Sequence, residues 1–131
     1  MFTAKAIREA FEATLARNGA SLGTWIVLNA LSEEGIVSQS MLASHAHVEG
    51  ATITHHVDRL EAQGLVRRQP DPADRRVRRI EPTPEGKRLH RKLLADMRAF
   101  ETTLFSGIDG GEREQLRSVL DRIGVNLERV D

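Results

Sequence analysis

The sequence predicts a mainly α-helical protein that carries one small β-hairpin, an α+β arrangement with few strands. Three observations lead to this fold class. Apolar residues recur at helical spacing along most of the 131 residues. Residues 65–81 have a different sequence pattern, in which arginines and β-branched residues flank the turn sequence "PDPAD". Residues typical of helix caps and turns separate the segments. We therefore expect six helices, one very short strand and one hairpin.

The first two helices are predicted from apolar spacing and from the turn between them. The "NGA" sequence at 18–20 ends the first helix, and Ser21 is a suitable N-cap for the second. The second helix is expected to stop near Gly35. The apolar face of the first helix consists of Ile7, Phe11 and Leu15, and that of the second of Trp25, Leu28 and Leu31.

A tight helix-turn-helix is predicted in the middle of the chain. Ile36 and Val37 are expected to form a very short strand, and Ser38 to cap a short helix over 39–46. A turn at 47–50 leads into a fourth helix over 51–63, with Gly64 at a left-handed C-cap. Its buried stripe is expected to be Ile53, Val57 and Leu60.

A hairpin and two long helices complete the predicted fold. The strands are expected at 65–69 and 76–81. Thr83 caps the fifth helix with Pro84 at its first position, and Asp109 and Glu112 form a capping box for the sixth. The apolar seam of the fifth helix is Leu89, Leu93, Met97, Phe100 and Leu104, and that of the sixth is Leu116, Val119, Leu120, Ile123 and Leu127.

Composition excludes several classes of protein. No apolar run approaches the roughly 20 residues of a membrane span, and the N-terminus carries charges where a secretory signal requires an apolar stretch. A cytoplasmic protein with no membrane association is therefore expected. The chain has no cysteine, which removes disulfides and thiolate metal ligands. No nucleophile motif, phosphate loop or acid–base pair stands out, so we expect no enzymatic activity and no cofactor.

The formal net charge of zero hides an uneven distribution. Residues 1–58 hold three basic and six acidic side chains, residues 59–92 hold eleven and five, and residues 93–131 hold five and eight. The middle segment is thus strongly basic between two acidic ends. Such a segment could be an ordinary solvated surface, but clustered arginines also favour binding to a polyanion.

The basic segment coincides with the predicted helix-turn-helix and hairpin. A short second helix can enter the major groove of DNA, while a following hairpin reaches the phosphates or the minor groove. Arginine pairs bidentately with phosphate or guanine. The sequence therefore predicts a surface that binds double-stranded DNA. Its expected contact residues are Thr52, Thr54, His55, His56, Arg59, Arg67, Arg68, Asp74, Arg75, Arg76 and Arg78.

The terminal helices are expected to form a dimer. A chain of this length has little core for their apolar stripes to cover, although the last two helices could also pack on each other as a hairpin. A two-fold homodimer would place two recognition helices about 34 Å apart on DNA. We expect one domain over 1–131, with a DNA-binding lobe at about 22–86 and dimerisation helices at about 1–20 and 87–131.

Taken together, these motifs resemble the MarR (multiple antibiotic resistance regulator) family of winged helix-turn-helix transcription regulators. The resemblance is carried by "LGTWIVLNAL", by "MLASHAHVEGATITHHVDRLEAQGLVRR" and by "DPADRRVRRIEPTPEG". The last segment has the Asp-x-Arg of the wing at Asp74 and Arg76. His47 and Glu49 depart from the family pattern, which usually has Gly and a Ser or Thr cap there.

The resemblance implies a homodimeric regulator, usually a repressor, that binds a pseudo-palindromic operator. It also implies that small aromatic or phenolic ligands bind between the dimer helices and the DNA-binding lobe and weaken DNA binding. Asp74 would brace Arg76 in the wing. Trp25 could line the ligand pocket or belong to the core, and Arg8 and Asn29 could supply polar contacts.

Two alternatives to a ligand-responsive DNA-binding regulator remain open from the sequence. His45, His47, His55 and His56 lie within twelve residues, and imidazole binds zinc well, which allows a zinc-responsive regulator. The lack of cysteine and the position of two histidines on the expected DNA surface argue against a metal site. The other alternative is a winged-helix dimer that binds a protein partner.

Overall fold

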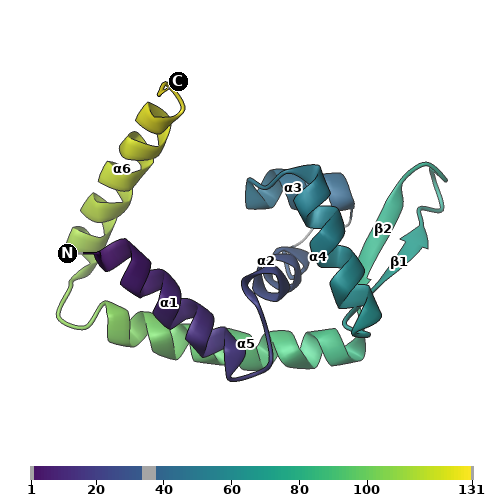
Figure 1. The fold of residues 1–131 in the computed structure, drawn as a ribbon, viewed down its shortest axis with the longest axis horizontal. Helices are drawn as coiled ribbons and strands as arrows, with labels where there is room; N and C mark the ends of the chain where they lie inside the picture. The colour runs from purple at the N-terminus through teal and green to yellow at the C-terminus, as the bar shows by residue number, and fades with distance from the viewer. Residues whose placement is uncertain (1, 34–37, 131) are drawn as a thin grey trace. The chain divides into compact units, whose positions relative to one another are not determined.

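The computed structural model describes residues 2–33 and 38–130. Within them it has the expected fold class: six helices and one two-stranded antiparallel hairpin (Figure 1). The very short strand expected at Ile36 and Val37 lies outside the described residues. The elements are α1 (Thr3–Ala16), α2 (Leu22–Leu31), α3 (Gln39–Ala46), α4 (Gly50–Ala62), β1 (Val66–Pro70), β2 (Arg78–Pro82), α5 (Pro84–Leu104) and α6 (Gly110–Leu127).

The predicted caps determine where four of the helices begin. Ser21 and Ser38 accept hydrogen bonds from backbone amides in the first turns of α2 and α3. The Thr83 hydroxyl accepts from the amide of Gly86 at 3.1 Å, and Asp109 forms the expected capping box with Glu112. These bonds satisfy amides that a helix leaves without an internal partner.

The turn into α4 is less conventional. Glu49 precedes the helix in an extended conformation, but its side chain makes no capping hydrogen bond. His47 ends α3 in the left-handed region, with φ of 53°, at the position where the family usually has Gly. A non-glycine residue adopts this conformation only where the surrounding structure supports it. Gly64, after α4, has φ of +73°, as the C-cap prediction required.

One hydrophobic core joins α2, α3, α4 and the hairpin, which lie together in Figure 1. Ile53, Val57 and Leu60 are the buried side chains of α4, as predicted. Burial of each such side chain contributes roughly 1.5–3 kcal/mol, so this stripe fixes which sides of α4 remain available. The other members are Val27, Leu28, Ala30, Leu42, Val66 and Ile80.

A second core cluster joins the end of α1 to α5. Leu15, Ala20, Leu93 and Met97 form it, and Phe11 and Trp25 pack against it. The side chain of Asn18 donates a hydrogen bond to Asp96 at 2.6 Å next to this cluster. These residues belong to one compact unit, Met1–Arg98, while Ala99–Asp131 form a second compact unit.

The hairpin is shorter on its second strand than the sequence suggested. β1 pairs with β2 in an antiparallel register that places Arg68 opposite Ile80. The second strand begins at Arg78 rather than residue 76, because the amide of Val77 donates to the carbonyl of Asp74 at 3.0 Å and closes a turn. An isolated bridge between Ser38 and Arg79 connects the hairpin to the start of α3.

The second unit leaves its long helix uncovered. No residue of α6 is buried, although one side of the helix is apolar. Within this unit, the guanidinium of Arg113 lies 4.3 Å from the centre of the Phe105 ring and pairs with Glu101. Among the described residues, no helix combines the length and apolar character needed to cross a bilayer. The exposed large apolar residues of α6 are Leu116, Val119, Leu120, Ile123, Val125 and Leu127.

Candidate nucleic-acid interface

Helix α4 presents two flanks beside its buried stripe. Helical spacing places Thr54, Asp58 and Glu61 on one flank, towards α3 and β1. His56 and Arg59 lie on the other flank, towards the start of α2. His55 is exposed between them, as is Thr52. The expected contact residues of α4 are therefore distributed over more than one surface.

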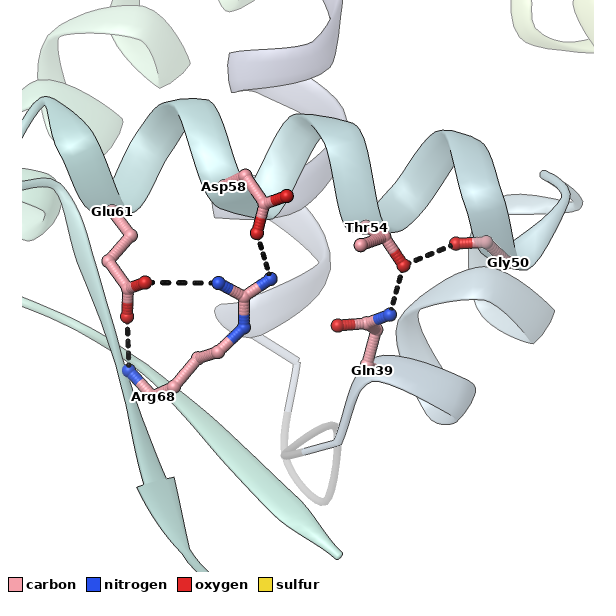
Figure 2. A network of polar contacts seen from close by, with 6 residues as sticks. All are labelled: Gln39, Gly50, Thr54, Asp58, Glu61 and Arg68. Carbon is pink, nitrogen blue, oxygen red and sulfur yellow. Dashed lines mark hydrogen bonds and ion pairs between the residues drawn. The ribbon is translucent and has the colours of Figure 1, made fainter.

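Thr54 is tied to its neighbours by two hydrogen bonds. Its hydroxyl donates to the carbonyl of Gly50 at 2.9 Å and accepts from the side-chain amide of Gln39 (Figure 2). Gln39 is the first residue of α3, so this contact connects the two helices of the helix-turn-helix at their N-terminal ends. Because the Thr54 hydroxyl both donates and accepts a hydrogen bond, its orientation beside the groove is fixed.

Arg68 has a different position from the one expected for a DNA contact. Its guanidinium lies 2.6 Å from Asp58 Oδ1 and 3.0 Å from Glu61 Oε1, and its side chain is only 14% exposed. Figure 2 shows the guanidinium between the two carboxylates of α4. The charge of Arg68, which was expected to contact DNA, is therefore already paired with two carboxylates.

The wing holds four other arginines of the expected set, Arg67, Arg75, Arg76 and Arg78, at exposed positions. Asp74 braces Arg76 as predicted: its carboxylate accepts from the Arg76 amide at 3.0 Å and from its guanidinium at 3.2 Å. Both hydrogen bonds lower the pKa of Asp74, and the bond from the Arg76 backbone amide has the larger effect. Arg75 and Arg78 are exposed, while Arg67 lies 3.5 Å from Glu81 across the hairpin.

A groove of about 820 Å³ lies between the helix-turn-helix and the wing. It brings together four of the residues expected to contact DNA: Thr54, Arg68, Arg76 and Arg78. Sequence reasoning missed its polar wall from α3, which comes from the helix cap and first turn. That wall could have been found from the polar run "SQS" directly after the expected strand. The additional polar residues lining the groove are Ser38, Gln39, Ser40 and Glu61.

His56 lies away from this groove. A Cβ atom on Gly23 would be 2.4 Å from Nδ1 of His56, so the imidazole occupies space that only a glycine in α2 leaves free. Partial burial, and then the neighbouring charges of His55 and Arg59, lower the pKa of His56. His56, which was expected to contact DNA, therefore lies on a different flank of α4 from Thr54.

The three residues considered for a ligand pocket fall into two places. Arg8 lines a cavity of about 550 Å³ with His56 and Arg59, and its guanidinium pairs with Glu12 at 2.9 Å. The other two residues surround His90, which stacks on Trp25 with ring centroids 6.0 Å apart and contacts Asn29 at 3.1 Å.

His90 was missed from the sequence because it is a polar residue beside an apolar helix seam. Burial lowers the pKa of His90. The ring of Phe11 contacts Trp25 edge-to-face, with ring centroids 6.4 Å apart. Trp25 is thus partly a core residue, the alternative left open for it. In the described part of the chain, no three His, Cys, Asp or Glu side chains are grouped so as to hold a metal ion.

Comparisons with known proteins agree with this architecture. A sequence model of the MarR family matches residues 21–77, from the cap of α2 to the turn of the wing. The crystal structure of a MarR family transcriptional regulator from Rhodococcus sp. RHA1 is 30% identical, with a TM-score of 0.77 over 92% of this chain and 86% of that chain. The repressor NicR of Pseudomonas putida is 32% identical over 99 residues, which are 76% of this chain and 63% of NicR.

A more distant structure shares the fold. The Bordetella bronchiseptica regulator BpsR is 22% identical, with a TM-score of 0.77 over 93% of this chain and 90% of that chain. NicR and the Rhodococcus protein are both transcription regulators. The matched helix-turn-helix and wing are also the elements that form the polar groove. The chain is a DNA-binding transcription regulator with a winged helix-turn-helix and belongs to the MarR family.

Proposed function

We propose that this chain acts as a homodimeric, ligand-responsive repressor that binds a pseudo-palindromic operator. The observation that carries the proposal is the groove between α3, α4 and the wing. It combines a polar wall, at Gln39 and Thr54, with two exposed arginines, Arg76 and Arg78. A surface of this kind suits a phosphate backbone beside the base edges of a major groove.

Within this proposal the residues of the site have distinct roles. Thr52 and His55, exposed near the start of α4, read base edges. Arg75, Arg76 and Arg78 bind phosphates or enter the minor groove from the wing. Arg59 and His56 belong to the cavity beside α1 and α2 rather than to the groove.

The dimer is proposed from the exposed apolar side of α6. Leu116, Leu120 and Ile123 are each between 46% and 54% exposed, and they recur along one face of the helix. A soluble chain gains by covering such a face, since removal of apolar surface from water is favourable. The second copy required by a palindromic operator is the proposed cover.

The proposed ligand is a small aromatic acid. The structural neighbour BpsR is described as having its DNA binding regulated by 6-hydroxynicotinic acid. In this chain, the cavity lined by Arg8, His56 and Arg59 has a volume in the range of small-molecule sites. Two arginines against one glutamate give it a positive balance, which favours a carboxylate. A ligand there would touch α4 directly and could alter its position on DNA.

The experiment that tests the regulator function is DNA binding by fluorescence anisotropy, with the DNA upstream of the protein's own gene and a scrambled duplex of equal length. We expect selective binding that weakens by orders of magnitude between about 50 and 200 mM salt if six or more phosphates are contacted. Equal, weak binding to both duplexes would contradict the operator proposal. Addition of 6-hydroxynicotinic acid to the bound complex then tests the ligand class.

A further inference from the structure

Polar contacts hold one flank of α4 at two positions along the helix (Figure 2). Near its start, Thr54 is held by Gln39 of α3. Near its end, Asp58 and Glu61 are held by Arg68 of β1. We propose that Arg68 is a positioning residue for DNA recognition, which fixes α4 to the wing and pairs with two carboxylates of α4 without itself touching a phosphate. This inference rests on the proposed operator binding.

The contacts of Arg68 involve both its side chain and its backbone. Nη2 lies 2.6 Å from Asp58 Oδ1, and Nη1 donates to Glu61 Oε1 at 3.0 Å. The second carboxylate oxygen of Glu61 accepts from the Arg68 amide at 3.1 Å. Glu61 therefore holds the strand backbone and the guanidinium at the same time. A planar guanidinium can bridge two carboxylates in this way, whereas a lysine ammonium offers only a point charge.

Exposure separates Arg68 from the arginines of the wing. The Arg68 side chain is 14% exposed, compared with 91% for Arg76. A phosphate would have to displace a carboxylate in order to pair with Arg68, and this exchange would leave that carboxylate unpaired. The guanidinium of Arg76 also pairs with a carboxylate, that of Asp74 at 3.2 Å, but its high exposure leaves room for a phosphate beside this partner. The positive charge available to DNA at this groove therefore comes from the wing.

Loss of Arg68 would have two consequences for DNA binding. The hairpin would lose its polar connection to the last turns of α4, so the wing and the recognition helix would no longer have a fixed relative position. In addition, Asp58 and Glu61 of α4 would be left uncompensated and would repel phosphates. Both consequences arise without any lost contact between Arg68 and DNA.

The test compares Arg68→Met with the triple variant Arg68→Met, Asp58→Asn, Glu61→Gln, which removes the arginine and both of its carboxylate partners. DNA affinity is measured on the upstream duplex as a function of salt, with Arg76→Met as the reference for a lost phosphate contact. We expect Arg68→Met to lose about tenfold or more in affinity. We expect the triple variant to recover only the part of that loss that comes from the unpaired carboxylates, because the connection between α4 and the wing stays broken. Both variants should keep the wild-type salt slope, because no phosphate contact has been removed.

The opposite result would overturn the inference. If Arg68 bound a phosphate, the salt slope of Arg68→Met and of the triple variant would decrease by about 0.9, as for Arg76→Met. Circular dichroism of each variant checks that it is folded. Arg68→Lys keeps the positive charge but lacks the planar guanidinium that bridges both carboxylates. Its DNA affinity is expected to lie between those of Arg68→Met and the wild type.

Failure of the proposed function would give a different pattern. If the wild-type protein bound neither duplex selectively, operator binding would be refuted, whatever the variants do. A double-mutant cycle of urea unfolding midpoints for Arg68→Met and Glu61→Gln then examines the contact without DNA. Non-additive midpoints are expected if Arg68 holds α4 to β1, and additive midpoints would refute that role.

Discussion

A Cβ atom placed on Gly86 would lie only 2.0 Å from the carbonyl oxygen of Leu65. This close approach occurs where α5 begins beside the base of the hairpin. The same carbonyl accepts a hydrogen bond from the amide of Thr83 at 3.0 Å, and the Thr83 hydroxyl donates to the carbonyl of Gly64 at 2.6 Å. The start of α5 and the start of β1 are therefore held together through backbone atoms that cannot move aside easily.

The first prediction is that Gly86→Ala destabilises the protein. Although alanine has the higher helix propensity, the backbone must shift to admit the methyl group, and overpacking of this kind typically costs about 1–3 kcal/mol. Urea unfolding measures the loss. Gly50→Ala is the control, since a Cβ there meets nothing within 4 Å. Equal stability of the two variants would show that the contact between Gly86 and Leu65 imposes no constraint.

Much of the fold follows from local chemistry that a sequence displays. Ser21, Ser38 and Asp109 are good N-caps wherever an apolar period follows them, and each caps a helix in the structure. The stripe of Ile53, Val57 and Leu60 is buried as its spacing requires. Such features depend on neighbours within a few residues, so the order and type of the elements could be predicted.

The site was less predictable because its contacts depend on tertiary structure. Arg67 and Arg68 are adjacent arginines with similar sequence surroundings, but a strand points successive side chains to opposite faces. Arg68 meets two carboxylates of α4, whereas Arg67 meets Glu81 across the hairpin. His56 likewise turns towards Gly23, because α2 leaves a space there. No spacing rule within one element identifies these partners.

The second prediction concerns Arg76 in the wing. Arg76→Met should lower DNA affinity and reduce the salt slope by about 0.9, the amount expected for one phosphate contact. Lys5→Met is the matched control, since it removes one positive charge from α1 at an exposed pair with Glu9. Anisotropy titrations at several salt concentrations measure both quantities. A slope equal to that of the Lys5→Met control would remove Arg76 from the interface.

The third prediction uses Trp25 as a reporter of His90. Trp25 is the only tryptophan of the chain, and its ring stacks on His90 at an interplanar angle of 25°. A protonated imidazole quenches indole emission. Since burial lowers the pKa of His90, emission should stay constant above about pH 6.5 and fall only at lower pH. His90→Gln should abolish the titration, and His45→Gln, at an exposed position of α3, should keep it.

The fourth prediction is that stability decreases in mild acid. The pKa values of His56 and His90 are lowered in the folded protein, so the unfolded chain binds more protons below about pH 6.5. Their contribution is therefore fully present above that pH and is lost as the pH falls towards the folded values. Urea midpoints at several pH values measure the effect. The double variant His56→Gln, His90→Gln should show a shallower decrease between about pH 6.5 and 5 than the wild type.

The last prediction addresses assembly through α6. Leu120 is 54% exposed and lies on the apolar side of the helix, so Leu120→Glu should place a charge in the proposed dimer interface. Ser118→Glu introduces the same charge on roughly the opposite side of α6 and serves as the control. Sedimentation velocity should show a dimer for the wild type and for Ser118→Glu, but a shift towards monomer for Leu120→Glu. Because a palindromic operator needs both recognition helices, the same variant should lose selective DNA binding. A dimer that survives Leu120→Glu would mean that the subunits associate through another surface.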